Sequence, residues 1–489
     1  MTTFMTSINP DLKKIVDEWI DANSEDIMKG LEIRSPKSLL KYERQLLSLV
    51  MQLGAIIIAW ILNTKLQDKN FQKYAKEKVM QRKSKKYKHQ TDLNTPIRTL
   101  FGNTIKPKLR YYVHKGRRGP KHKVGNRGKN GSGIYPALEL LGIQFGTTPA
   151  LAGEVARSVA DGPSMNDAKV NLQHWGISLD IKTIRRISEA FADTGLAIRD
   201  EWFDESDPHH TPLVSENERF RGKRVLISTD GGRIRIRKNK RGRIAKGNKR
   251  HGYNTNWREP KLVTIRTIDD NGRVLRQDNP ILDGTIGGPD EIFKILRSHL
   301  VARDIKQASE IVCVGDGALW IWDRMKRLMD ELKIDSSKVH FVLDFYHAVE
   351  HLSTVADGKR GWNKRKRKKW LKEMKNRLKH GNVDDILVKL KDLARGRNAK
   401  AVKREMKYFK ENKERMRYDV FMNKKLPIGS GAMESGIRQV VNMRLKSAGM
   451  FWKKENAEGF LHLRCYLKSN RWDIVENAVI NYSPKTGRV

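Results

Sequence analysis

The sequence predicts an α/β protein with a mainly helical N-terminal region and a large, basic α-helical insertion in its core. Three observations predict this class. Helical periodicity dominates the chain before residue 219. Short apolar runs that end in Asp or Gly then alternate with amphipathic stretches over residues 219–354. Residues 355–427 are strongly basic with helical periodicity, and they divide this core from its C-terminal part, residues 428–489, which carries a further helix.

Residues 1–97 are predicted to form a basic helical region that binds DNA or mediates oligomerisation. An apolar stretch at 46–62 has 17 residues, contains Ser48 and Gln52, and is at the short limit for a membrane span. We therefore expect a buried or self-associating helix there and no membrane contact. The first residues lack the basic-then-apolar order of a signal peptide, which favours a cytoplasmic protein.

Residues 98–134 are predicted to form a strand hairpin followed by a basic loop. The pattern TLFGNTIKPKLRYYVHK has strand character, with Gly102 and Asn103 at the turn. The loop sequence GRRGPKHKVGNRGKNGSG (116–133) is rich in Gly, Lys and Arg and contains no acidic residue.

Residues 135–218 are predicted to contain a helix-turn-helix that binds DNA. One helix is expected at 164–175, a turn at Gly176 and a second helix from about residue 180. Ile184, Ile187 and Phe191 would face the core. A second helix of this kind can enter a major groove, although an ordinary helical subdomain is the alternative. The predicted DNA contacts on its outer face are Lys182, Thr183, Arg185 and Arg186.

Residues 219–354 carry strands and helices in a defined order. Strand patterns occupy 223–232, 261–269, 280–288, 310–320 and 338–347, and helical patterns occupy 290–302 and 324–333. The order is three strands, helix, strand, helix, strand, helix, which is that of a ribonuclease H-like domain. In that domain the first and fourth strands lie side by side. The Gly-rich fingerprints of nucleotide-binding folds are absent.

Three carboxylates are candidates for a metal site. Asp230 ends the first strand and Asp316 ends the fourth, so both are expected at one edge of the sheet. Glu434, in the first turn of a Gly-led helix, is the best third acid. For Glu259 the alternatives are an auxiliary acid near the site and an ordinary surface position, of which we favour the second. Clustered carboxylates repel one another unless a cation is present, and oxygen ligands suit Mg²⁺ or Mn²⁺. Two such ions can activate a water or a 3′-hydroxyl against a phosphodiester.

The stretch VLDFYHAVEHL (342–352) raises a different possibility. It places His347, Glu350 and His351 in the H-x-x-E-H spacing of inverted zinc proteases. A zinc protease explains neither the charge of the chain nor the acids that end its strands. We therefore disfavour this alternative.

The charge of the chain predicts a nucleic acid partner. There are 98 Lys and Arg residues against 56 Asp and Glu, a formal net charge of +42. Such an excess repels itself unless a polyanion neutralises it, and binding to DNA phosphates does so with release of counterions. The only cysteines, Cys313 and Cys465, exclude a disulfide scaffold and suit a reducing cytoplasm.

Two basic runs lie beside the acidic positions in sequence. RIRIRKNKRGRIAKGNKR (233–250) follows Asp230 and is expected to form a hairpin or loop, and KRGWNKRKRKKW (359–370) lies in the insertion. We expect both runs to contact the DNA backbone, and an indole ring in the second can stack on unpaired bases. The predicted contacts are Arg233, Arg235, Arg237, Lys238, Lys240, Arg241, Arg243, Trp362, Lys364, Arg365, Lys366 and Arg367.

Several segments, in this order, resemble a known family. STDGG, VGDGALWIW, DFYHAVEHL and IGSGAMESGIRQVVNMRLKSAGMFW resemble the corresponding blocks of ISKra-type bacterial insertion-sequence transposases, within the Mutator-like DDE transposases. With RTLFG, LLGIQFGTTPALAGEVA and WREPKLVTI, the resemblance covers residues 98–472. It implies a ribonuclease H-like core with a helical insertion.

The resemblance also implies roles for individual residues. The DDE triad falls on Asp230, Asp316 and Glu434, and a Cys/Asp-x-x-His signature falls on Asp344 and His347. His347 is then expected to contact the scissile phosphate or to orient a carboxylate, with Asp344 as an auxiliary residue. Many relatives carry cysteine pairs upstream of the core, and this chain has none there.

These observations predict a bacterial, nucleoid-associated transposase of an insertion sequence. It is expected to bind the terminal repeats of its element and target DNA, as a homo-oligomer of two or more copies. Cleavage and strand transfer would depend on two Mg²⁺ or Mn²⁺ ions. The alternative is a catalytically inactive DNA-binding protein derived from a transposase, against which the presence of all three acids speaks.

Overall fold

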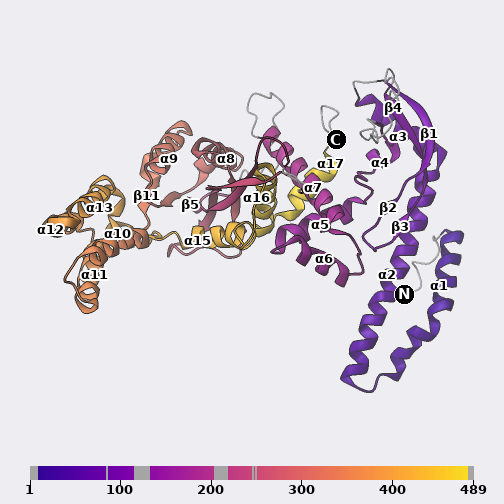
Figure 1. The fold of residues 1–489 in the computed structure, drawn as a ribbon, viewed down its shortest axis with the longest axis horizontal. Helices are drawn as coiled ribbons and strands as arrows, with labels where there is room; N and C mark the ends of the chain where they lie inside the picture. The colour runs from indigo at the N-terminus through magenta and orange to yellow at the C-terminus, as the bar shows by residue number, and fades with distance from the viewer. Residues whose placement is uncertain are drawn as a thin grey trace. The chain divides into compact units, whose positions relative to one another are not determined.

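The structure of the chain is a computed structural model that describes residues 9–83, 86–114, 133–202, 218–244, 247 and 251–482 (Figure 1). It contains two compact units, Met1–Phe191 with Glu476–Val489, and Ala192–Val475. The predicted basic loop at 116–133 lies outside the described residues except for Gly133. The division falls within one helix, Ile181–Trp202, rather than at the predicted boundary of 218–219, because Arg199 in that helix is buried in the second unit.

The first unit begins with three helices and continues with two small antiparallel sheets. The helices are α1 (Pro10–Met28), α2 (Pro36–Gln67) and α3 (Lys69–Gln81), as predicted for this region. Strand β1 (Tyr87–Asn94) pairs with β4 (Lys108–His114), and β2 (Ile97–Arg98) pairs with β3 (Thr104–Ile105). The predicted turn at Gly102 is confirmed, with φ +81°.

The helical prediction for the whole of residues 1–97 is wrong at β1. Seven of the eight residues of β1 are exposed, so its sequence lacks the apolar alternation by which a strand is recognised. Its order comes from backbone hydrogen bonds to β4, which the sequence pattern does not reveal.

Helix α2 buries few of its apolar side chains completely. Only Leu49 and Leu66 of its 32 residues are buried, most of residues 51–62 are half-buried and six large apolar residues are exposed, so the first of the two alternatives, a buried helix, does not hold. Among the described residues, α2 is also the one helix long and apolar enough to cross a membrane. For a single helix, length and composition are weak grounds, and self-association stays a prediction.

The remaining helices of the first unit include the pair predicted from sequence. They are α4 (Pro136–Leu140), α5 (Pro149–Asp161), α6 (Met165–His174) and α7 (Ile181–Trp202), and α17 (Trp472–Asn481) begins in the second unit. Ser164 caps α6, and Gly176 has φ +77° in the turn before α7. The side chains of Ile184, Ile187 and Phe191 are buried, as their spacing predicted.

The second unit contains a mixed five-stranded sheet. Its strands are β5 (Arg224–Gly231), β8 (Lys261–Ile268), β9 (Ile281–Thr285), β10 (Glu310–Gly315) and β11 (Val339–Leu343), in the spatial order β11-β10-β5-β8-β9. β10 and β11 are parallel to β5, whereas β8 is antiparallel to β5 and β9 to β8. With α8 (Pro289–Val301), α9 (Leu319–Glu331) and α10 (Phe345–Gly358), these strands confirm the predicted order of elements and the pairing of the first and fourth strands.

The two faces of this sheet carry different helices. Val225 and Ile227 of β5 pack with apolar residues of α8 and α9. Leu226, which points to the opposite face, belongs to a cluster with residues of α10 and of the insertion.

The predicted insertion is helical and packs on the sheet. It consists mainly of α11 (Lys364–Lys379), α12 (Val383–Leu393), α13 (Ala399–Glu411) and α14 (Tyr418–Asn423), the orange helices of Figure 1. Met374, Phe409 and Tyr418 share one buried cluster with Val312 and Leu343 of the sheet. The insertion is therefore fixed to the core by continuous apolar packing.

Two further pieces complete the second unit. The predicted hairpin after Asp230 is present as β6 (Ile234–Asn239) and β7 (Tyr253–Arg258). After the insertion the chain forms α15 (Gly431–Ile437), a π-helical turn (Arg438–Asn442) and α16 (Lys454–Lys468). Helix α15 packs on β5 and β8, and α16 packs on β9.

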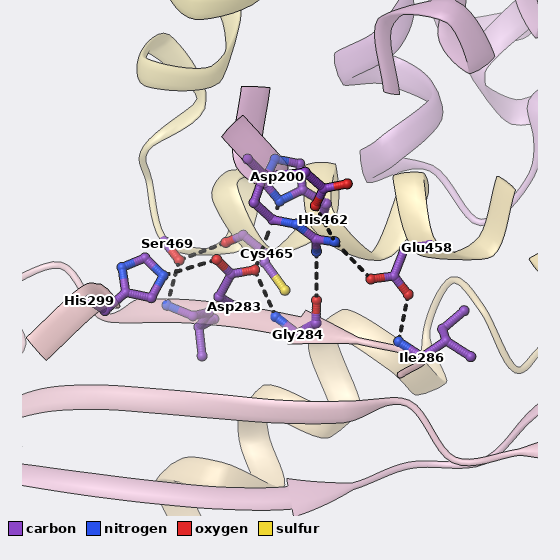
Figure 2. A network of polar contacts seen from close by, with 11 residues as sticks. Asp200, Asp283, Gly284, Ile286, His299, Glu458, His462, Cys465 and Ser469 are labelled. Carbon is purple, nitrogen blue, oxygen red and sulfur yellow. Dashed lines mark hydrogen bonds and ion pairs between the residues drawn. The ribbon is translucent and has the colours of Figure 1, made fainter. Parts of the chain in front are cut away.

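A buried polar network closes the edge strand β9 (Figure 2). The Asp283 carboxylate bonds the ring of His299 at 2.9 Å and accepts from the Gly284 amide at 2.8 Å. Glu458 accepts from the backbone N–H of Ile286 at 2.6 Å and forms an ion pair with Arg199 at 3.1 Å. These side chains of α16 and α7 supply partners to the backbone at the edge of the sheet.

The network makes stability depend on pH. Burial lowers the pKa of His299 from 6.5 to about 4, although Asp283 opposes this shift. Hydrogen bonds and the charges of His299 and His462 lower the pKa of Asp283, despite its burial. Since the unfolded state binds a proton at His299 near pH 6.5 and the folded state only near pH 4, stability falls as the pH drops through this window.

We expect the urea midpoint of the protein to fall between pH 6.5 and 4, with the His299 contribution amounting to up to about 3 kcal/mol. His299→Gln should show a shallower decline, because glutamine keeps a hydrogen-bond donor to Asp283 but does not titrate. The exposed His251→Gln variant is the matched control. Identical pH profiles for His299→Gln and the wild type would contradict the assignment.

Candidate active site

Three parallel strands end in aspartates at one edge of the sheet. In the β10–β5 register Val314 pairs with Ser228, so Asp316 and Asp230 follow at the same level, two residues on. In the β10–β11 register Gly315 pairs with Leu343, so Asp344 follows beside Asp316. Neighbouring strands lie about 4.8 Å apart. The structure therefore brings Asp230 and Asp316 together, as the strand order predicted.

The ionised form of Asp230 is disfavoured by its surroundings. Burial, with the negative charges of Asp316 and Glu259, raises its pKa to about 6, against the opposing effects of the Gly231 amide and His347. The Gly231 N–H donates to Asp230 Oδ1 at 2.6 Å. A divalent cation would remove the electrostatic cost of the adjacent carboxylates, so the pair suits an oxygen-ligated metal such as Mg²⁺ or Mn²⁺.

Asp316 is held by its own loop. Its Oδ1 accepts from the Ala318 amide at 2.9 Å, and its backbone carbonyl accepts from Trp322 Nε1 at 2.8 Å. Trp322 is buried, so it packs beneath the site. These contacts fix the loop and leave the second carboxylate oxygen of Asp316 for a ligand.

Glu434 lies on the same face of the sheet as Asp230 but is exposed. Leu262 is the cross-strand partner of Asp230, and a Cβ at Gly436 of α15 would lie 3.8 Å from the Leu262 side chain. Within the described part of the chain, no three His, Cys, Asp or Glu side chains are grouped closely enough to hold a metal ion. The structure thus joins two predicted acids and leaves the third on an adjoining helix.

Asp344 is buried and forms hydrogen bonds with two segments of the chain. Its Oδ1 accepts from the amides of Tyr346 at 2.7 Å and His347 at 3.2 Å, which caps α10. Its Oδ2 accepts from the Ser430 amide at 2.8 Å and from the Ser430 hydroxyl. With both oxygens engaged, Asp344 positions α10 and the start of α15, and its auxiliary role stays a prediction.

His347 is half-exposed near the two strand-terminal acids. Its Nδ1 lies 3.3 Å from Glu350 Oε2, and its side chain is 42% exposed. Its charge lowers the pKa of Asp230, which places it within electrostatic reach of that carboxylate. This position fits contact with a phosphate at the site.

His351 has a different environment from His347. Its Nδ1 lies 2.5 Å from Oε2 of the buried Glu405, which also pairs with Arg404 at 2.8 Å. The rings of His347 and His351 meet edge to face, with centroids 5.4 Å apart. Among the described residues, neither histidine belongs to a group of three side chains that could hold a metal ion.

Two further residues lie near the site. Glu259 is at the surface, with its side chain 57% exposed, and it lies against Gly231, where an added Cβ would be 2.2 Å from its Oε1, which agrees with the alternative of an auxiliary acid near the site. The strand pairing brings it there, since β8 runs beside β5. The other is Tyr408 of α13, whose pKa is raised by burial and by the nearby charges of Asp316 and Asp344. No sequence pattern connects the insertion to this edge.

The basic hairpin β6–β7 offers charge and aromatic rings together. The guanidinium of Arg235 lies between the rings of Trp257, at 5.7 Å, and Phe451, at 4.5 Å, and Arg237 lies over Tyr253 at 5.9 Å. The exposed cations among the predicted contacts are Arg233, Arg237, Lys238, Lys240, Arg241 and Arg243. Because the hairpin continues directly from Asp230, its base is fixed beside the two acids.

The predicted contacts of α7 and the insertion are also mostly accessible. Lys182, Arg185 and Arg186 are exposed, although Arg186 donates to the Phe145 carbonyl at 3.1 Å and the Thr183 hydroxyl donates to Asp180 at 2.7 Å. In the insertion Lys364, Arg365 and Lys366 are exposed, and Arg367 contacts Asp357 at 3.4 Å. The ring of Trp362 packs on Trp370, with centroids 5.6 Å apart.

The raised pKa of Asp230 predicts an effect on stability. A carboxyl whose pKa is higher when folded contributes stability below its ordinary pKa of 3.8, and loses it as the pH rises through about 6. Without divalent cations at pH 8, Asp230→Asn should therefore melt a few degrees above the wild type, on the order of 1–3 kcal/mol. The difference should vanish near pH 4.

Mg²⁺ should raise the melting temperature of the wild type more than that of Asp230→Asn. The exposed Asp270→Asn variant serves as the control, with no expected change in either comparison. A melting temperature for Asp230→Asn at or below that of the wild type at pH 8 would show that the carboxylate is not destabilising.

No protein-family model matches the chain, and the comparison with curated proteins finds no match. The function of the site is therefore inferred from its geometry and chemistry.

Proposed function

We propose that this chain is a DNA transposase of the insertion-sequence type that cuts and joins DNA strands at a metal site formed by Asp230, Asp316 and Glu434. The observation that carries the proposal is the pairing of Asp230 and Asp316 at the ends of adjacent parallel strands, with the pKa of Asp230 raised to about 6. Carboxylates with strongly perturbed pKa values cluster at functional sites.

The sheet topology supports a ribonuclease H-like core. The first strand, β5, is central, the next two run antiparallel on one side, and the last two run parallel on the other. The helices α8 and α9 cover one face and α15 lies on the other. The transposase resemblance assigns the triad to Asp230, Asp316 and Glu434, and the insertion lies between the last strand and the helix that carries Glu434.

Each residue has a distinct proposed task. Asp230 and Asp316 hold Mg²⁺ or Mn²⁺, and Glu434 completes the ligand set from α15. When bound, two such ions supply an activated water or 3′-hydroxyl and stabilise the leaving oxygen of a phosphodiester. His347 contacts the scissile phosphate. Asp344 fixes the helices that carry His347 and Glu434.

The distribution of charge supports DNA as the substrate. The net charge of +42 contrasts with the locally acidic edge, so the surrounding cations can hold phosphates while the acids hold metal. We assign backbone contacts to the β6–β7 hairpin and to α11, and major-groove contacts to α7 as the second helix of a helix-turn-helix. The bound DNA would be the terminal repeats of the element and the target.

We further propose that the protein works as a homo-oligomer in the bacterial cytoplasm. Two element ends must be held together for strand transfer, and the exposed apolar surface of α2 supports self-association of two or more copies. Two buried free cysteines agree with a reducing compartment.

Incubated with Mn²⁺ and DNA that carries the ends of its element, the protein should nick or cleave that DNA. Asp316→Asn should lower the cleavage rate by at least about 100-fold, because removal of a metal ligand costs more than loss of its supporting contacts. Its affinity for the ends should stay within a few fold. Asp290→Asn, an exposed acid of α8, is the matched control and should cleave normally.

Two outcomes would contradict the proposal. Full cleavage by Asp316→Asn would show that Asp316 is not part of the active site. Tight and specific end binding by a wild-type protein that never cuts would instead favour the inactive, transposase-derived DNA-binding protein.

A further inference from the structure

The β6–β7 hairpin buries one face and leaves the other open to solvent. Ile234 and Ile236 of β6 are buried. Arg235 and Arg237 alternate with them and therefore point to the opposite face, because successive side chains of a strand lie on opposite sides. All six residues of β7 are exposed. The hairpin is thus anchored through β6 and presents an accessible outer face.

The outer face combines cations with aromatic rings. Trp257 pairs with Arg235, and side chains directly opposite each other in an antiparallel pair lie on the same face. Tyr253 is an even number of residues from Trp257 and lies on this face too. The two side chains are 59% (Trp257) and 43% (Tyr253) exposed. The ring of Phe451 joins them, since it lies 5.7 Å from the ring of Tyr253 and 4.5 Å from the guanidinium of Arg235.

An exposed indole beside guanidinium groups favours a nucleic acid partner. Aromatic rings bind single strands by stacking on their bases, while neighbouring cations hold the backbone. Bases within a duplex present only their edges in the grooves, so the face of a ring suits unpaired bases. A second copy of the chain, joined through this same face, is a poorer partner, because the exposed cations Arg237, Lys238 and Lys240 would meet the same charges.

The hairpin begins beside the acidic edge of the sheet. Arg235 is five residues after Asp230, so their Cα atoms are at most about 18 Å apart. Trp257, opposite Arg235, is five residues before Leu262, the cross-strand partner of Asp230. A DNA strand with a phosphate at Asp230 therefore reaches the ring of Trp257 within a few nucleotides.

We propose that the outer face of the β6–β7 hairpin binds unpaired bases of the DNA strand held at Asp230 and Asp316, with one base stacked on Trp257. Arg237 holds the backbone of that strand, and Arg235 keeps the indole ring in position. This inference rests on the proposed function and adds base stacking to the backbone contacts assigned there. The face selects frayed or cut strands over intact duplex.

The test measures the affinity of the full chain for a fluorescent oligo(dT) of about 12 nucleotides and for a duplex of the same length, without divalent cations. Trp257→Leu, which keeps an apolar side chain but removes the ring, should weaken oligo(dT) binding about 5- to 100-fold, the effect of losing one stacked base. Its duplex affinity should stay within about twofold of the wild type. Trp257→Phe should restore most of the oligo(dT) affinity, because it returns a ring.

The matched control is Trp175→Leu. Trp175 is 55% exposed, similar to Trp257, and its ring packs edge to face with His174 in the turn after α6. Its loss should leave oligo(dT) affinity within about twofold of the wild type. An equal loss of oligo(dT) affinity in both variants would overturn the inference, since stacking would then not be specific to the hairpin.

Further outcomes separate this inference from the proposed function. Unchanged oligo(dT) affinity in Trp257→Leu overturns the inference, and an equal loss of duplex affinity does so too, because the ring would then not select unpaired bases. A change in the oligomeric state of Trp257→Leu also overturns it, since the face would then join copies of the chain. The proposed function fails separately, if the wild type does not cleave element ends in Mn²⁺.

Discussion

One buried carboxylate, that of Asp344, holds the arrangement of the second unit together. It caps α10 and at the same time bonds Ser430, which is 86 positions away across the insertion. Its own amide donates to the carbonyl of Gly315, directly before Asp316. Removal of a partner in such a buried network leaves charged or polar groups unpaired, at a cost of several kcal/mol. The positions of His347 and Glu434 both depend on this one side chain.

The acidic edge and the basic surface are physically complementary. The chain carries a formal charge of +42, yet Asp230 lies beside other carboxylates in a place that raises its pKa to about 6. An edge of this kind is destabilising in the free protein, and carboxylates perturbed in this way cluster at functional sites. In the proposed function, the surrounding Lys and Arg side chains would hold phosphates by long-range attraction, whereas the acids would act at short range through a cation.

Much of the second unit could be predicted because the residues that identify each strand and helix are consecutive in the sequence. Apolar strands ending in Asp, separated by amphipathic helices, were enough to order the sheet and to place Asp230 beside Asp316. The turn at Gly176 was predictable for the same reason, since the helical periodicity of the apolar residues is interrupted at this glycine.

The remaining features depend on contacts between distant segments. Strand β1 is exposed on nearly every residue and is ordered only by its partner β4, so its own sequence gives no period to detect. Tyr408 and Glu259 reach the site through packing of the insertion and through strand pairing. The apolar run of α2 showed that a helix exists but could not show that its surface is exposed.

The most direct test of the account is the position of Mn²⁺ in crystals of the full chain soaked with the ion, located by its anomalous scattering. The account predicts a peak between the carboxylates of Asp230 and Asp316, with Glu434 drawn in as a further ligand, and loss of the peak in Asp230→Asn crystals. A peak at His347 and His351 with none between the aspartates would contradict it. So would the absence of any bound Mn²⁺ at millimolar concentration.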